Sequence, residues 1–257
     1  MKNIHIPTID ELMRPEPIRK LDNGNYAFTK IIYQGKVLRE VEFCPDYLEH
    51  KAEMSQKDWE KYSATKGWCV TDAEILYQCL LKAYELRNEA KIVKEFRMDM
   101  QEIFDSAEDT LPLTTLTKVS FGSGLDAVVS SLRPIKKRTP AILPEFTKDS
   151  QDYCTLVLAP EQPEKDLGKT IPLPRNARPL MKVLLGKGYE QAGAVFQYFS
   201  KLKDGNLREA ILWTPTKTNR NSKMPVEMGI FDRGEFALTM EQPVLELGTP
   251  TLGVRIK

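Results

Sequence analysis

The longest helical pattern in the chain spans residues 71–104, where large apolar residues recur every three or four positions. Its first half has an apolar stripe made of Ile75, Leu76, Cys79, Leu80, Ala83 and Leu86. Its second half has another, made of Ala90, Ile92, Val93, Phe96, Met100, Ile103 and Phe104. At about 100° per residue the two stripes point in different directions. One straight helix cannot hold both against one core, so we predict a bend or break at residues 87–89, with Asn88 starting the second helix.

The start of this pattern has the residues of a helix cap. Thr71 is followed three positions later by Glu74, the spacing of a capping box. In that motif the Thr hydroxyl accepts from the Glu N–H, and the Glu carboxylate reaches back to the Thr N–H. We therefore predict Thr71 as the N-cap residue.

Alternating apolar positions predict strands before and after these helices. A hairpin is expected over residues 26–43, turning at Gln34-Gly35, and Cys44-Pro45 is expected to end it. A short capped helix is expected from Ser55. Further strands are expected over residues 113–121, 125–132 and 153–158, with the first two joined at Gly122-Ser123-Gly124. The Pro-rich and Lys-rich segments 133–152 and 160–174 are expected to be irregular.

The C-terminal half predicts two helices followed by strands. Leu180, Met181, Leu184 and Leu185 form one apolar face, and a second helix is expected over residues 189–202. Gly186-Lys187-Gly188 separates them, which gives an αα-hairpin. Strands are then expected at residues 210–213, 226–230, 236–240 and 251–256, with a polar loop at 214–224.

These elements define an α+β fold. Its order is an N-terminal hairpin and long helical segment, a middle β region, an αα-hairpin and a C-terminal antiparallel β-meander. We predict a division into residues 1–110 and 111–257, and a single domain with one shared sheet is an equally good alternative.

Composition narrows the functional classes only slightly. The 257 residues carry a net charge of +1, and 41% of them are hydrophobic, enough for a substantial core. Four cysteines and two histidines match no zinc spacing, so we expect reduced thiols, no cofactor, no disulfide-linked partner and a cytoplasmic protein. With no apolar run long enough to span a bilayer, we expect no membrane partner.

Basic residues are concentrated in the C-terminal half. Residues 178–223 contain nine lysines and arginines against three acidic residues. Such a segment would attract phosphates if its side chains share a face. The candidate anion-binding or nucleic-acid-binding residues are Lys187, Arg208, Lys217, Arg220 and Lys223. The more ordinary interpretation is a set of solvated faces balanced by acidic helices elsewhere.

Three further patterns have an ordinary structural interpretation, which we favour in each case. Gly186-Lys187-Gly188 precedes a helix and could bind an anion through backbone N–H groups, but it lacks the Walker pattern and fits a turn between helices. Gly122-Ser123-Gly124 fits a hairpin turn. Glu95, Asp99 and Glu102 share one helical side and could hold a divalent cation, but they also fit the solvated flank of an amphipathic helix.

The sequence therefore leaves three functional hypotheses open. The leading one is a non-enzymatic binding or interaction protein, because no convergent catalytic set is visible. The second is a nucleic-acid-binding or processing factor that uses the basic C-terminal half. The third is a carboxylate-dependent and metal-dependent enzyme. A protein partner or a nucleic acid is compatible with the charge pattern.

Overall fold

The protein is described by a computed structural model that covers residues 16–47, 68–89, 91–105, 113–122, 126–131, 137–144, 148–149, 153–167, 171–215, 224–231, 234–240 and 252–257. Helices and mainly antiparallel sheets make up these residues, so the predicted α+β class is confirmed. The expected helix from Ser55 and most of the polar loop 214–224 lie outside the described residues. None of the helices in the described ranges combines the length and apolar character needed to cross a membrane.

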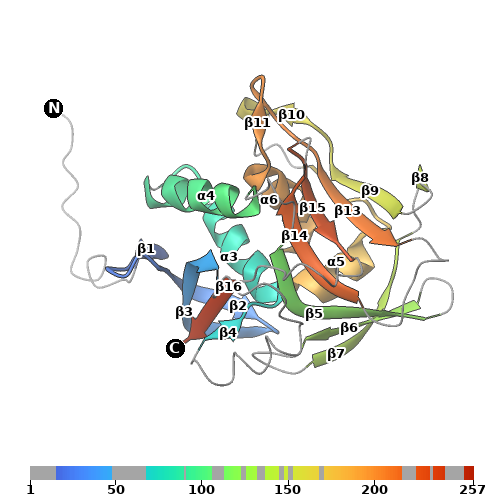
Figure 1. Cartoon of the computed structure of the whole chain (residues 1–257), viewed down its shortest axis with the longest axis horizontal. Helices are drawn as coiled ribbons and strands as arrows, with labels where there is room; N and C mark the ends of the chain where they lie inside the picture. Colours follow the sequence, from blue (N-terminus) through green and yellow to red (C-terminus); the bar gives the residue numbers. More distant parts are fainter. Residues whose placement is uncertain are drawn as a thin grey trace.

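The first sheet brings together strands from residues 18–70 and a strand from residues 252–256. Its strands lie in the order β1-β2-β3-β16-β4, and every neighbouring pair is antiparallel. Their bounds are β1 Ile18–Lys20, β2 Tyr26–Tyr33, β3 Lys36–Tyr47, β4 Cys69–Val70 and β16 Leu252–Ile256. The predicted hairpin is confirmed, and φ is 49° at Gln34 and 74° at Gly35, as a type I′ turn requires. Figure 1 shows β16, in red, lying among the blue N-terminal strands.

Strand β3 is longer than the sequence predicted. Cys44-Pro45 was expected to end it, but it continues to Tyr47. Opposite this point the register with β16 shifts, since Cys44 pairs with Gly253 and Tyr47 with Leu252. A proline has no N–H to donate, and a bulge leaves residues without a ladder partner. The bulge therefore accommodates Pro45 within the strand.

The second sheet has the order β7-β6-β5-β14-β15-β13-β9-β8. Its strands are β5 Leu113–Phe121, β6 Asp126–Ser131, β7 Lys137–Ile142, β8 Lys148–Asp149, β9 Tyr153–Ala159, β13 Ala210–Pro215, β14 Met224–Ile230 and β15 Phe236–Thr239. The β14–β15 hairpin is antiparallel as expected, and β13 adds to it by pairing in parallel with β15. A small third sheet has the order β10-β12-β11, formed by β10 Gln162–Pro163, β11 Leu202–Lys203 and β12 Asn206–Leu207.

The prediction of an irregular segment over residues 133–152 was wrong at β7 and β8. Strand β7 pairs along its length with β6 despite Pro140. Because β7 is at the edge of the sheet, only one of its sides takes part in a ladder. A proline is tolerated on such an edge strand, where it removes no hydrogen bond to a further neighbour.

Helix α3, Ala73–Glu85, lies at the centre of the molecule. It contacts β2 of the first sheet, β5 of the second and the helices α5 Arg178–Leu185 and α6 Ala192–Phe199 (Figure 1). Nearly all of its residues are buried, including Ile75, Leu76 and Cys79. One continuous apolar cluster includes residues from α3, α4 and both large sheets.

The predicted break in the long helical pattern is confirmed. Helix α3 ends at Glu85, a turn follows, and α4 runs from Lys91 to Phe104, so the second helix begins after Asn88 rather than at it. The predicted cap was wrong, since Asp72 rather than Thr71 is the N-cap residue. The Asp72 carboxylate accepts the Ile75 N–H at 2.8 Å, and the Tyr33 hydroxyl and the Ser131 hydroxyl (2.7 Å) also donate to it.

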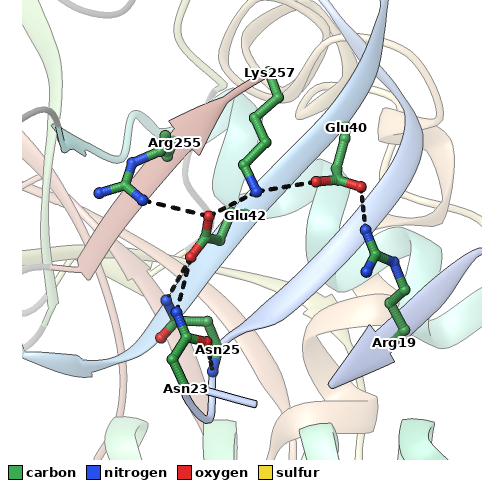
Figure 2. A network of polar contacts seen from close by, with 7 residues as sticks. All are labelled: Arg19, Asn23, Asn25, Glu40, Glu42, Arg255 and Lys257. Atoms are coloured by element: carbon green, nitrogen blue, oxygen red, sulfur yellow. Dashed lines mark hydrogen bonds and ion pairs between the residues drawn. The ribbon is translucent and has the colours of Figure 1, made fainter. Parts of the chain in front are cut away.

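Charged side chains cover the outer face of the first sheet. Val41 and Phe43 of β3 point into the core, so the alternating Glu40 and Glu42 lie on the opposite face. Figure 2 shows Lys257 between these two carboxylates, 3.2 Å from Glu40 and 3.0 Å from Glu42. Arg255 of β16 lies 3.5 Å from Glu42 and 4.2 Å from the Trp68 ring, and Arg19 of β1 pairs with Glu40.

The Glu42 carboxylate is the centre of this charge network (Arg19, Asn23, Asn25, Glu40, Glu42, Arg255 and Lys257). Its side chain is only 3% exposed. Burial by itself would raise the pKa of Glu42, but hydrogen bonds from Asn25, Lys257 and Asn23 outweigh it and lower that pKa to about 2. The network therefore holds a buried negative charge and ties β16 to β3.

Candidate binding groove

A groove with a volume of about 820 Å³ runs along α3 between two walls. Glu74, Gln78, Leu81, Lys82 and Glu85 of α3 form its floor. These residues recur at helical spacing, so they follow one side of the helix. The β2–β3 hairpin forms one wall, and the turn from α5 to the short helix η2, Tyr189–Gln191, forms the other.

Side chains of α3 hold the α5–η2 turn in place. The Gln78 amide donates to the carbonyl oxygens of Leu185 at 2.9 Å and Lys187 at 2.7 Å. The Tyr77 hydroxyl donates to the carbonyl of Gly188 at 2.6 Å. Carbonyl groups at the end of a helix lack partners within the helix, and here α3 supplies them. The turn is therefore fixed by hydrogen bonds from side chains of α3.

Two glycines allow the turn to approach α3 closely. A Cβ atom at Gly186 would lie 2.3 Å from the Glu74 Oε1, and one at Gly188 would lie 2.6 Å from the Leu81 Cδ2. Both glycines also have positive φ, 71° and 77°. The sequence Gly186-Lys187-Gly188 is thus a tightly packed interhelical turn. The carbonyl groups of Leu185, Lys187 and Gly188 accept hydrogen bonds from side chains of α3.

The hairpin wall is attached to the same helix. The backbone N–H of Gln34 donates to the Glu74 Oε1 at 2.8 Å, and Glu74 itself is 6% exposed. Ile32 and the strongly exposed Val37, which pair across the hairpin, lie at this wall. Glu74 therefore contacts both walls near the N-terminus of α3.

Four lysines and three glutamates line the groove. Lys30, Lys82, Lys182 and Lys187 reach it from β2, α3, α5 and the turn. Within the described parts of the chain, none of these four lysines forms an ion pair. The acidic lining residues are Glu74, Glu85 and Glu190.

The acidic charges gather near Tyr77. Burial is the main cause that raises the pKa of Tyr77 far above its usual value, and the nearby Glu190 and Glu85 raise it further. Tyr77 thus stays a neutral hydrogen-bond donor. Glu85 lies at the C-terminal end of the groove floor, and Glu190 lines the groove from η2.

The predicted anion-binding residues are only partly described. Lys187 lies in the groove, while Lys217, Arg220 and Lys223 lie outside the described residues. Arg208 lies elsewhere, paired with Glu161 at 2.6 Å. Its carbonyl accepts from Ser200 at the end of α6, whereas Lys187 precedes the start of η2 and α6. Lys187 and Arg208 therefore lie beyond opposite ends of the segment formed by η2 and α6. A nucleic-acid surface made of all five residues stays a prediction.

The acidic flank of α4 has partners. Asp99 accepts from the Tyr26 hydroxyl at 2.6 Å and from Lys20 at 3.5 Å, and Glu95 lies 3.6 Å from Lys91. Among the described residues, no group of three or more His, Cys, Asp or Glu side chains is placed to hold a metal ion.

Sequence reasoning found Lys187 and the glycine turn but missed the rest of the groove. Glu74 was assigned only to a capping box, and Gln78 was not singled out. The signal that could have revealed them is a polar residue within a helix that is otherwise buried all round, since a buried amide or carboxylate requires partners.

Comparisons with known proteins give no further information on the groove. No protein-family model, no curated protein and no solved structure matches the chain.

Proposed function

We propose that the chain is a binding protein that holds a segment of a partner protein in the groove along α3. The observation that carries this proposal is the contrast between fixed walls and four lysines that form no ion pair with the described residues. The hydrogen bonds of Glu74, Tyr77 and Gln78 fix the hairpin and the α5–η2 turn. The lysines that line the groove can form ion pairs with an external partner.

A protein segment suits this lining better than a polyanion. The groove presents both lysines and carboxylates, together with the apolar Ile32, Val37 and Leu81. Protein interfaces combine an apolar centre with charged groups that choose the partner and its orientation. A polyanion offers negative groups to the lysines but no apolar side chains to Ile32, Val37 and Leu81.

The proposal is tested by selecting peptides from a random twelve-residue display library on the full chain. Selected peptides are then titrated against the Lys182→Glu/Lys187→Glu variant, which reverses two exposed charges of the groove. We expect binding to weaken about tenfold, because each reversal replaces an attraction with a repulsion.

The matched control is the variant Lys165→Glu/Lys203→Glu, which makes the same change in net charge at exposed lysines on the small third-sheet region. It should bind the selected peptides like the unmodified chain. Failure to enrich any peptide, or equal loss of binding in both variants, would show that the groove is not a peptide-binding site.

A further inference from the structure

Within the described residues, strand β2 leaves part of one backbone edge unpaired beside the groove. Strand β1 pairs with β2 only at Tyr26, Ala27 and Phe28. The N–H of Thr29 donates to the carbonyl of Pro17 at 3.1 Å, and there the contact between the strands ends. From residue 30 to residue 33, β3 is the only strand in the described chain that pairs with β2. In an antiparallel strand alternate residues direct N–H and C=O groups away from the paired neighbour.

Lys30 marks the boundary between the paired and the unpaired edge. Its φ is 58°, in the left-handed region that non-glycine residues rarely adopt. Lys30 directly follows Thr29, the last residue of β2 that donates a backbone hydrogen bond to the segment before β1. Lys30, Ile31 and Ile32 all line the groove. The unpaired edge and the groove therefore belong to one surface.

We propose that an acidic segment of a partner protein binds in this groove as an extended strand added to the edge of β2 at residues 30–33. This inference rests on the proposed binding function and specifies its mode and its partner chemistry. Backbone hydrogen bonds to β2 would hold the segment, as in other cases of strand addition. Four residues of strand span about 13 Å, close to the roughly 16 Å of α3 between Glu74 and Glu85.

Charge complementarity selects an acidic segment. Glu74 is nearly buried and accepts a hydrogen bond from Gln34. The remaining charged lining consists of four lysines against Glu85 and Glu190, an excess of positive charge. Three of the lysines, Lys82, Lys182 and Lys187, lie on the floor and on the wall that faces β2. An added strand would run between them and β2, so its acidic side chains would reach these lysines while its apolar ones contact Ile32 and Val37.

The test uses a capped eight-residue peptide that alternates valine with aspartate, together with any groove-dependent peptide from the library. Amide hydrogen exchange of the isotope-labelled full chain is followed with and without peptide. We expect exchange to slow about tenfold at alternate residues of segment 30–33. N-methylation of single peptide amides should weaken binding about tenfold at every second position and little at the others. A peptide that alternates valine with lysine serves as the charge control and should bind at least about tenfold more weakly.

The outcomes separate this inference from the proposed function. A first outcome is that peptides bind in the groove without an alternating effect of N-methylation and without slower exchange at residues 30–33. That result would overturn strand addition, but the proposed binding function would stand. Equal binding of the lysine peptide would overturn the acidic partner. Concentration-dependent self-association that protects the same amides would assign the edge to a second copy of the chain. Tighter binding of single-stranded oligonucleotides than of any peptide would overturn both proposals.

Discussion

Gly188 and Gly205 have the same backbone φ of 77° in different surroundings. A Cβ at Gly188 would collide with Leu81, whereas nothing lies within 4 Å of one at Gly205. We expect Gly205→Ala to lower the free energy of unfolding by about 1 kcal/mol, the cost of a left-handed backbone for alanine. Gly188→Ala should cost roughly 2–4 kcal/mol, because overpacking against Leu81 is added. Urea denaturation of the two variants measures the difference, and equal losses would mean that the turn does not press on α3.

Asp72 joins three parts of the structure at one carboxylate. It caps α3 at Ile75 and accepts from Tyr33 of β2 and Ser131 of β6. Asp72→Ala removes the cap and leaves buried donors without an acceptor, so we expect a loss of about 3 kcal/mol in unfolding free energy. Asp72→Asn keeps an oxygen for the Ile75 N–H and should cost less. Thermal and urea unfolding of both variants gives the comparison, and an equal loss in the two would contradict the capping role.

The choice between Thr71 and Asp72 illustrates what the sequence leaves open at this scale. Both residue types cap helices well, and the capping-box spacing pointed to Thr71. Glu74, the expected partner in that box, instead accepts from Gln34, forty residues earlier in the chain. The Ala73 N–H donates to Thr117 of β5 at 2.9 Å. The identity of the N-cap residue is therefore determined by tertiary contacts, and a local sequence pattern does not contain these contacts.

At the scale of elements, the charge network makes the attachment of β16 sensitive to acid. The folded-state pKa of Glu42 is lowered to about 2, below its ordinary value. As the pH falls below about 4.5, the unfolded chain takes up a proton at this position before the folded chain does. The stabilisation by Glu42 is therefore complete above the unfolded pKa and is lost as the pH falls towards 2. We expect the unfolding free energy to decrease over this window.

The variant Glu42→Gln isolates this contribution. It should be less stable than the unmodified chain at pH 7, and the difference should shrink as the pH approaches 2. Urea denaturation at several pH values measures the slope of stability against pH. A difference that stays constant from pH 7 to pH 2 would show that the Glu42 charge does not stabilise the sheet.

Local patterns predicted most elements but not their neighbours. Periodicity and turn residues predicted four features that the structure confirms. They are the β2–β3 hairpin, the break after α3, the β5–β6 pair and the turn between α5 and η2. Strand β7 was missed because Pro140 and the lysines of its segment are typical of loops. What makes it a strand is its pairing with β6 at the sheet edge, a non-local contact.

At the scale of the whole molecule, the groove was beyond sequence prediction for a related reason. Its lining comes from three segments, around residues 30–37, 74–85 and 182–191. Each segment reads as an ordinary hairpin, helix or turn, and only the packing of β2 and α5 on α3 brings them together. Lys187 was identified as a candidate, but the lysines that join it there were not.

The division into residues 1–110 and 111–257 remains a prediction, and removal of β16 would test it. Deleting residues 252–257 takes a strand from between β3 and β4 and removes the cations that pair with Glu42. If the shared sheet unites the chain, calorimetry should show one transition in the full chain and a midpoint at least about 10 °C lower in the truncated one. Two separate transitions, with only the first shifted by truncation, would support two independent regions.

The position of β16 also has a consequence for the timing of synthesis. The first sheet begins at Ile18, yet its fourth strand in spatial order is made of residues 252–256. Roughly 200 residues are translated between β3 and β16, which takes about 10–40 s at the usual rates of elongation. During that interval one side of β3 has no strand beside it on the ribosome. The first sheet therefore stays incomplete until residues 252–256 have been made.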